Sequence, residues 1–457
     1  MSTDTIAGVR KDRLHAFAAR EAATYAKARP KAAAALKKGA GSFLSGVPMH
    51  WMADWPMPHL PLVASARGAR IKDIDGNTLD DFCLGDTGSM FGHSPAPVAR
   101  AIRAQARHGL TYMLPTEAAL EAGRLLTERF GAFRWQIATT ATDANRFALR
   151  VARAITGRPK VLVFNGCYHG TVDETFVTLE NGVTATTPGL LGQVNDLTAT
   201  ATCCEFNDLA AVEAALAKGD IAAILTEPVM TNSCMVLPDA GFHDGLRQLS
   251  RHYGALLIMD ETHTISSGLG GYTGVHSLRP DIFVVGKCVA GGMPTAVWGL
   301  TDDTAQAYEK ANANRPSGRS GMGTTLSGNP MQFACLVANL SEVMTAENYA
   351  HMEKGAERLS QGLAKSIVRH GAPWHVVRVG ARVEFICAPG PLRNGAEAAF
   401  AHQPQLEAAI HTGLINRGSL IAPFHNMMLV SPATTKGQID RLITHFDAIL
   451  TDLFAKA

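Results

Sequence analysis

The sequence predicts an α/β protein with a large domain on a mostly parallel sheet and a second, smaller α+β domain. From about residue 96, segments with helical periodicity alternate with short apolar segments, a pattern typical of a parallel sheet covered by helices. Two of these segments, 255–259 and 282–285, are apolar throughout, as in strands buried on both faces. After Pro330 a long helical stretch is followed by short strands near 376–387, which indicates the smaller domain.

The chain has 457 residues, of which 46% are hydrophobic and 18% are charged. This length is enough for two or three domains. We expect residues 1–84 to form an N-terminal arm and hairpin that join the small domain, 85–335 to form the large domain, and 336–457 to form the C-terminal small domain.

The bulk composition argues against several classes of partner. The net charge of +2 gives no indication of a nucleic-acid or membrane surface, and no apolar stretch approaches the ~18 residues of a membrane span. The eight cysteines are scattered without a CxxC pair, as in reduced cytoplasmic proteins. We therefore predict a cytoplasmic protein with a small-molecule substrate and no metal site.

The N-terminal elements follow from composition and turn residues. The Ala-rich start predicts a helix, a Pro-, Trp- and Met-rich stretch predicts an ordered loop, and Asp75-Gly76-Asn77 predicts a hairpin turn. These elements are expected at 1–40, 41–65, 69–74 and 78–82.

The large domain is expected to contain five helices and four strands, read from the 3.6-residue period and from short apolar runs. The helices are predicted at 98–108, 117–130, 145–156, 209–217 and 241–253, and the strands at 160–164, 221–226, 255–259 and 282–285. A final helix at 436–453 closes the chain.

Charged residues follow two of the predicted strands. Segment 255–259 leads into Asp260, and segment 282–285 leads through Gly286 into Lys287. Functional groups of an open parallel sheet gather beyond the carboxyl ends of its strands, so one ligand could contact both side chains. A carboxylate and a lysine in an apolar setting suit pyridoxal phosphate, because the lysine forms a Schiff base and the carboxylate holds the pyridine proton. Taken alone, Asp260 could also cap a turn and Lys287 could lie on the surface.

Further stretches could contact the same ligand. Thr140, Ala141 and Thr142 open a helix whose N–H groups could bind a phosphate, although threonine is also a common N-cap. Tyr168 follows the strand at 160–164 and could lie over a planar ring. Glu227 ends the strand at 221–226, where a buried acid needs a partner.

The order of these motifs resembles that of class III, fold type I pyridoxal-phosphate aminotransferases, and is most similar to their glutamate-1-semialdehyde aminomutase branch. The similarity extends from about Gly46 to the C-terminus. Its most specific parts are Tyr168-His169-Gly170, the segments 254–261 and 280–294, and Leu326-Ser327-Gly328-Asn329-Pro330.

The resemblance implies a pyridoxal 5'-phosphate cofactor bound to Lys287 as an internal aldimine. The freed Lys287 would move a proton between Cα and C4′, Asp260 would pair with the pyridine nitrogen, and Tyr168 would stack on the ring. The backbone at Ala141 and Thr142 would hold the phosphate.

The resemblance also implies a homodimer, because Thr325 would reach the phosphate of the partner subunit. Thr262 stands where the family usually has a valine under the ring, and the next residue, His263, replaces a frequent methionine. The aminomutase loop with its Ser and Arg is replaced by a segment that contains Met49 and Trp51. These departures make Met49, Trp51 and His263 candidates for the substrate pocket, with structural packing as the other interpretation.

The leading functional prediction is an aminotransferase that moves an amino group between an amine or amino acid and a keto or aldehyde acceptor. A glutamate-1-semialdehyde-type 2,1-aminomutase, a racemase or a decarboxylase could use the same machinery. A non-catalytic ligand-binding protein on this scaffold is the rival class, and the presence of both Lys287 and Asp260 argues against it. Arg146 and Arg417 are the candidates for binding a substrate carboxylate.

Overall fold

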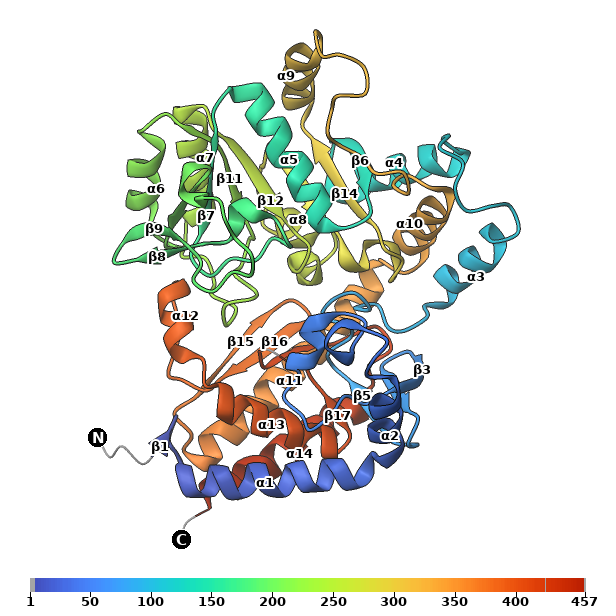
Figure 1. Ribbon diagram of the computed structural model, residues 1–457, viewed down its shortest axis with the longest axis vertical. Helices are drawn as coiled ribbons and strands as arrows, with labels where there is room; N and C mark the ends of the chain where they lie inside the picture. Colours follow the sequence, from blue (N-terminus) through green and yellow to red (C-terminus); the bar gives the residue numbers. More distant parts are fainter. Residues whose placement is uncertain (1–4, 424, 456–457) are drawn as a thin grey trace. The chain divides into compact units, whose positions relative to one another are not determined.

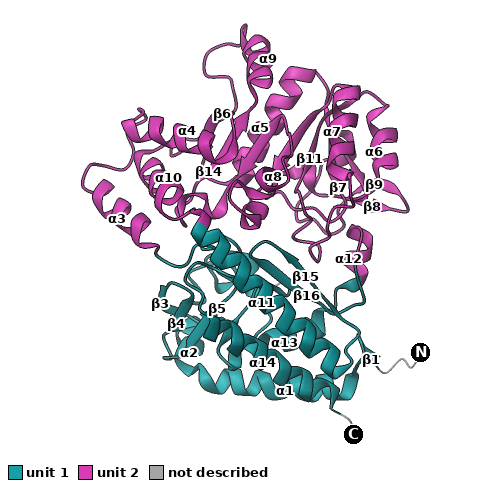
Figure 2. Ribbon diagram, turned by 180° about the vertical axis from the view of Figure 1, so that it is seen from behind, with its two compact units in different colours: residues 1–94, 347–391, 401–457 teal, residues 95–346, 392–400 magenta. Residues whose placement is uncertain are grey.

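The structure is a computed structural model that describes residues 5–423 and 425–455. It contains two compact units (Figure 2). Unit 1 comprises the chain up to residue 94, Glu347–Pro391 and the chain from Ala401 onward, and unit 2 comprises Pro95–Ala346 and Leu392–Phe400. The domain limits after residues 84 and 335 stay predictions.

Unit 2 is built around a seven-stranded sheet (Figure 1) with the order β10-β7-β11-β12-β13-β14-β6. Neighbours from β10 to β13 pair in parallel, whereas β14 runs antiparallel between β13 and β6. The predicted mostly parallel sheet is confirmed. The strands are β6 (Arg134–Ala138), β7 (Lys160–Phe164), β10 (Ala201–Cys204), β11 (Ile221–Thr226), β12 (Leu256–Asp260), β13 (Ile282–Val285) and β14 (Ala296–Leu300).

Both faces of this sheet are buried, since alternate strand residues enter different cores. Along β7, Val161 and Val163 belong to the core with α5 (Ala141–Thr156), whereas Leu162 and Phe164 belong to the core with α6 (Leu209–Leu216) and α7 (Phe242–Tyr253). A strand covered on both faces needs apolar residues at every position, which explains the continuous apolar runs in the sequence.

Further helices and a hairpin complete unit 2. They are α3 (Ala96–Gln105), α4 (Glu117–Phe130), α8 (Gly271–Val275), α9 (Asp302–Asn312), α10 (Pro330–Glu342) and most of α12 (Gly395–Ala401), with the hairpin β8 (Val177–Glu180) and β9 (Val183–Thr186). Single 3₁₀ turns are η3 (Asp173–Thr175), η4 (Leu197–Ala199), η5 (Thr264–Ser267) and η6 (Lys287–Ala290).

Three strands of the main sheet are missing from the sequence prediction. β6 and β10 carry polar residues within short segments, and β14 contains Gly299, which weakens the signal for a strand. A Cβ atom on Gly299 would lie 2.7 Å from the Cβ of Phe133 and 2.8 Å from the ring of Trp135. Close packing therefore requires a glycine at position 299, and the same glycine weakens the strand pattern in the sequence.

Unit 1 contains two small sheets, β15-β16-β18 and β17-β5-β4-β3, a short β1-β2 hairpin, and helices that share one core. Its strands are β1 (Thr5–Ile6), β2 (Val9–Arg10), β3 (Val63–Arg67), β4 (Arg70–Asp73), β5 (Thr78–Asp81), β15 (His375–Val379), β16 (Arg382–Ile386), β17 (Ser419–Leu420) and β18 (Met427–Leu429). Its helices are α1 (Lys11–Ala28), α2 (Pro30–Gly39), η1 (Leu44–Gly46), η2 (His50–Asp54), most of α11 (Ala346–His370), α13 (Pro404–Asn416) and α14 (Lys436–Phe454).

The prediction of one helix over residues 1–40 is wrong in its described part. The chain forms the β1-β2 hairpin first, and the helix then breaks at Arg29, because a proline disfavours helical geometry in the residue before it. Arg29 is buried at this break, where its guanidinium lies 3.2 Å from Asp73 and over the ring of Tyr25. The hairpin of β4 and β5 is present as predicted.

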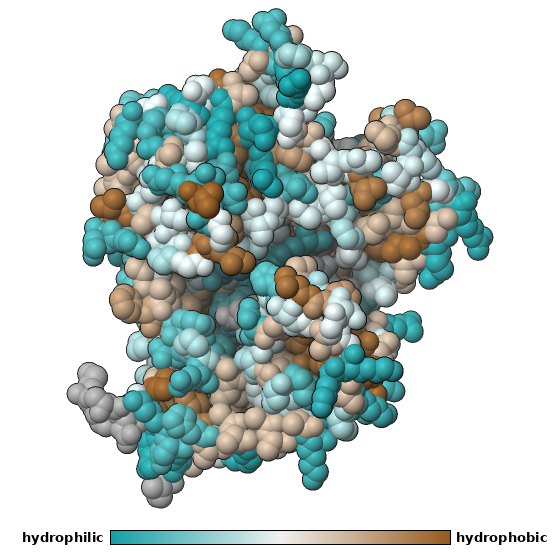
Figure 3. All heavy atoms as spheres, in the orientation of Figure 1, coloured by the Kyte–Doolittle hydropathy of each residue, from teal (hydrophilic) through white to brown (hydrophobic). Residues whose placement is uncertain are grey.

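One face of the surface is shown in Figure 3. Hydrophilic side chains cover much of the face shown in Figure 3, and hydrophobic side chains occur on it in small groups. Within residues 5–423 and 425–455, no helix combines the length and apolar composition needed to cross a membrane. The cytoplasmic location stays a prediction.

Candidate active site

The candidate site lies at the carboxyl ends of the parallel strands of unit 2. Asp260 ends β12 and pairs in register with Val284 of β13, three residues before Lys287. Lys287 has φ of 49°, in the left-handed region that residues other than glycine seldom adopt. Strained backbone of this kind concentrates at functional sites.

The Asp260 carboxylate is buried and held by three donors. Its Oδ2 accepts hydrogen bonds from Asn145 Nδ2 at 2.8 Å and His169 Nδ1 at 2.9 Å, and its Oδ1 accepts one from the Thr262 N–H at 3.1 Å. Burial alone would raise the pKa of Asp260, but these hydrogen bonds and the charge of His169 hold the pKa below its ordinary value. Asp260 is therefore kept ionised in a nearly solvent-free position.

His169 carries the matching positive charge. Burial would lower the pKa of His169, but Cys167 and Asp260 next to it raise the pKa well above its ordinary value. The two side chains form a buried ion pair. The sequence offered only a weak signal for His169, its place between Tyr168 and Gly170, and no signal that Asn145 would join it.

Lys287 meets a second group of side chains. Its Nζ is hydrogen-bonded to Nε2 of His263, and Nδ1 of His263 lies 2.5 Å from Thr231 Oγ1. The Thr231 hydroxyl in turn contacts Glu227 Oε2. Burial raises the pKa of Glu227, against the lowering effects of His169 and Thr231. His263, predicted as a pocket residue, thus lies against the lysine amine.

Two glycines, Gly286 and Gly170, pack closely against the N-terminus of α5. A Cβ atom on Gly286 would lie 2.9 Å from the Cβ of Ala141, and one on Gly170 would lie 2.1 Å from Thr142 Oγ1. The segments that carry Lys287 and Tyr168 therefore both adjoin this helix terminus. The N-cap is Thr140, whose Oγ1 accepts from the N–H of residue 143 at 3.2 Å.

The remaining candidates differ in exposure. Tyr168 is 46% exposed, Thr325 is exposed, and Thr262 is buried. Met49 and Trp51 belong to unit 1, where they are 51% and 38% exposed. Their roles stay predictions.

Arg417, considered as a carboxylate-binding residue, has acidic partners within unit 1. Its guanidinium lies 3.2 Å from Glu21 and 3.5 Å from Asp452. These ion pairs tie α1, α13 and α14 together, so Arg417 has a structural role.

The residues of this site fit pyridoxal phosphate. Asp260 offers a buried carboxylate for a pyridinium N–H, and the first turn of α5 offers backbone N–H groups without helical acceptors. Glu227 Oε1 and Thr262 Oγ1 are buried atoms without a hydrogen-bond partner among the described residues, as expected where polar atoms serve a ligand. Within residues 5–423 and 425–455, no cluster of His, Cys, Asp or Glu is placed to hold a metal ion.

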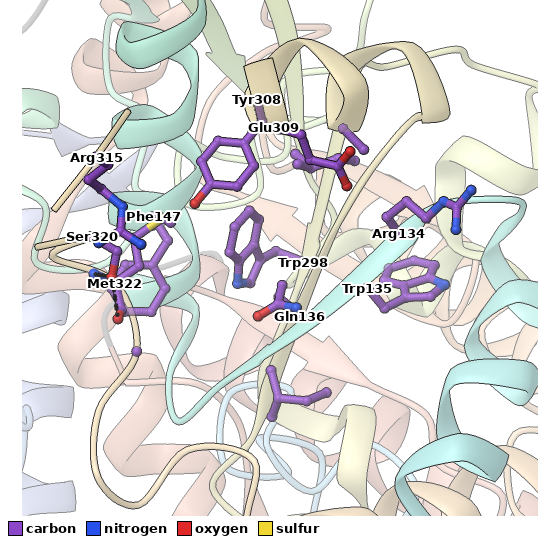
Figure 4. A pocket seen from close by; sticks show the side chains of 14 residues that line it. Arg134, Trp135, Gln136, Phe147, Trp298, Tyr308, Glu309, Arg315, Ser320 and Met322 are labelled. Atoms are coloured by element: carbon purple, nitrogen blue, oxygen red, sulfur yellow. Dashed lines mark hydrogen bonds between the residues drawn. The ribbon is translucent and has the colours of Figure 1, made fainter. Parts of the chain in front are cut away.

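A separate cavity of about 410 Å³ lies elsewhere in unit 2. The rings of Phe147, Trp298 and Tyr308 line it together with Arg315 (Figure 4). None of the predicted site residues lines this cavity, so it is distinct from the candidate site.

Comparisons with known proteins show the family of this chain. A model of the aminotransferase class-III family matches residues 52–450. Over 400 residues the chain is 33% identical to a glutamate-1-semialdehyde 2,1-aminomutase of Desulfitobacterium hafniense (strain DSM 10664 / DCB-2). The aligned residues make up 86% of this chain and 91% of the relative.

Two solved structures extend the comparison. A glutamate-1-semialdehyde-aminomutase from Pseudomonas aeruginosa PAO1 is 45% identical, has a TM-score of 0.96, and matches 98% of this chain and 100% of its own. An omega-transaminase from Sphaerobacter thermophilus is 25% identical, has a TM-score of 0.84, and matches 92% and 97% of the two chains.

Proposed function

Because this chain belongs to the class-III aminotransferase family, we propose that it moves an amino group on a small molecule with pyridoxal 5'-phosphate. The family, the fold type I architecture and the cofactor predicted from the motifs are confirmed.

Lys287 and Asp260 would have different roles in such an enzyme. When bound, the cofactor supplies an electron sink for a carbanion at the substrate Cα. Lys287 would hold the cofactor through its aldehyde group and would move the proton at the substrate Cα. Asp260, which accepts hydrogen bonds from His169 and Asn145, would hold the proton on the ring nitrogen of the cofactor.

The first candidate reaction is that of a 2,1-aminomutase. Its support is the 45% identity over 98% of the chain to a protein described as a glutamate-1-semialdehyde-aminomutase. The test is to supply glutamate-1-semialdehyde and measure the isomer in which the amino group has moved from carbon 2 to carbon 1. Formation of this isomer without an added amino donor would support the mutase, and its absence under saturating cofactor would refute it.

The second candidate is an aminotransferase with separate donor and acceptor. Its support is the segment His50–Asp54 with its neighbour Met49, where Met49 and Trp51 are exposed and apolar. Apolar substrate surface buried on such side chains contributes roughly 25 cal/mol per Å². Bulky amines or amino acids should then exceed glutamate-1-semialdehyde in kcat/KM, and Trp51→Ala should weaken the bulky substrates selectively. Equal losses for all substrates, or an unfolded variant, would count against this candidate.

The non-catalytic alternative is tested at Lys287. We expect the purified protein to show the visible absorption band of bound cofactor, and Lys287→Ala to lose both the band and the turnover. A Lys287→Ala protein that keeps full turnover would refute the central role of this residue, and a wild-type protein that binds cofactor without any turnover would favour a binding protein.

We also propose a homodimer in which Thr325 completes the partner's site. The proposal rests on the resemblance of the turn 324–330 to the family motif and on the exposure of Thr325. Sedimentation of the purified protein would measure the oligomeric state directly.

A further inference from the structure

We propose that His263, Thr231 and Glu227 form a proton relay that takes a proton from the ammonium group of Lys287 and leaves the neutral amine. The proposal deepens the proposed function and rests on it, because Lys287 is the residue that would bind the cofactor. Three of the residues follow the carboxyl ends of neighbouring strands of the sheet. Glu227 follows β11, His263 follows β12 and Lys287 follows β13.

The contacts form a continuous chain. Lys287 Nζ is hydrogen-bonded to His263 Nε2, His263 Nδ1 lies 2.5 Å from Thr231 Oγ1, and Thr231 Oγ1 lies 2.5 Å from Glu227 Oε2. Glu227, Thr231 and His263 are each no more than 5% exposed. Bulk water is therefore kept from these three side chains.

The chemistry of the two ends fixes the direction of the hydrogen bonds. An ammonium group only donates and a carboxylate only accepts, so His263 Nε2 accepts from Lys287 and Glu227 accepts from Thr231. A neutral imidazole then carries its hydrogen on Nδ1 and donates it to the Thr231 hydroxyl. Asn232 lies 3.3 Å from Nδ1 as well, and with its amide reversed its oxygen would be a second acceptor.

The transfer balances along this chain. The Lys287 ammonium gives one proton to His263 Nε2, His263 releases its Nδ1 proton to Thr231, and the Thr231 hydroxyl proton passes to the Glu227 carboxylate. His263 and Thr231 end with as many protons as they began with. An ammonium and a carboxylate become an amine and a carboxylic acid, so the total charge is unchanged and no proton reaches solvent.

Glu227 is suited to receive the proton. Burial raises the pKa of its carboxyl group, and the nearby charge of Asp260 adds to the increase, whereas His169 and Thr231 oppose it. Transfer of the proton to Glu227 would leave the Lys287 amine neutral, and this is the form that attacks an aldehyde or accepts a proton from a substrate.

The first test uses the holoenzyme without substrate. In it, the protonation of the Lys287 nitrogen is followed by titrating the visible absorption band of the bound cofactor against pH. His263→Met removes the group that accepts the proton in the relay, so the protonated nitrogen should keep its proton to about one pH unit higher. The matched control is His243→Gln, a buried histidine of the same unit that contacts the Pro228 carbonyl and should leave the midpoint unchanged.

An unchanged midpoint in folded His263→Met protein would overturn the relay. Because no substrate is added, this result does not depend on which amino-transfer reaction is correct. A protein without any visible band would instead contradict the proposed function.

The second test interrupts the middle of the path. Thr231→Val keeps the shape but removes the hydroxyl, whereas Thr231→Ser keeps the hydroxyl. In single-turnover half-reactions with an amine donor, we expect Val to slow proton transfer by about 10-fold or more and Ser to stay near the wild-type rate. Equal rates in the two variants would overturn the relay even if His263→Met failed to fold.

Discussion

At the residue scale, the charge of Asp260 is set by the side chains that surround it. Its carboxylate loses nearly all contact with solvent, and Asn145, His169 and the Thr262 N–H replace the lost water. Without these donors, burial would favour the neutral acid. The site therefore depends on residues that do not themselves reach the reacting atoms.

Asp260→Asn tests whether this charge matters for chemistry. The amide cannot hold the ring-nitrogen proton by charge, so we expect turnover to fall by roughly 10² or more with cofactor at saturation. Steady-state kinetics measure the loss, and the thermal unfolding midpoint controls for stability. Near-normal turnover would rule out the electronic role.

His169 should make stability depend on pH. An unfolded histidine loses its proton near pH 6.5, whereas His169 keeps its proton to higher pH because its pKa is raised. Its contribution is fully present below pH 6.5 and is lost as the pH rises through the raised pKa, at up to about 1.4 kcal/mol per pH unit. We expect the thermal unfolding midpoint to fall less between pH 6.5 and 9 in His169→Gln than in the wild type.

His243→Gln is the matched control for this effect. Burial lowers the pKa of His243 to about 4, so this histidine is neutral in both the folded and the unfolded state above pH 6.5. Its replacement should leave the pH dependence unchanged. A wild-type slope in His169→Gln would contradict a charged His169.

At the element scale, the N-terminus of α5 is shaped by the glycines packed on it. Gly170 has φ of 81° and lies against Thr142, while Gly157 has φ of 68° and would place a Cβ atom in open space, with no other atom within 4 Å. Alanine at either position strains the backbone by a similar amount, on the order of 1 kcal/mol. Only alanine at Gly170 would also displace the helix start.

Gly170→Ala should therefore weaken cofactor binding more than Gly157→Ala. We expect at least a 10-fold rise in the cofactor dissociation constant for the first variant and little change for the second, because a small misplacement of the first turn disturbs its N–H groups. Equilibrium titration with pyridoxal phosphate gives both values. Equal dissociation constants would show that this terminus does not hold the phosphate.

At the scale of the whole molecule, the proposed sharing of sites between subunits can be tested by mixing. A Lys287→Ala chain and a Thr325→Ala chain, each inactive or weak alone, should form hybrid dimers in which one site has both defects and the other has neither. We expect activity to recover partially as subunits exchange. No recovery, with exchange demonstrated by mass spectrometry, would argue that Thr325 acts within its own chain.

The sequence by itself determined the main features of the large unit. Helix α4 and strands β7, β11 and β13 lie where the apolar patterns predicted them, because strands buried on both faces must be apolar at every position. Asp260 and Lys287 could be singled out because each closely follows such an apolar run. Local patterns thus indicate a candidate site whose residues lie at the carboxyl ends of strands.

Tertiary structure alone decided which side chains meet there. Asn145 and His169 lie 24 positions apart in the sequence, yet both donate to Asp260, and the contact between Lys287 and His263 joins the ends of two adjacent strands. Hydrogen bonds between side chains at the ends of neighbouring strands produce no periodic pattern in the sequence, because they depend on the strand order and on the conformation of each loop. The contacts of the proposed relay from Lys287 to Glu227 therefore depend on β11, β12 and β13 lying side by side in the sheet.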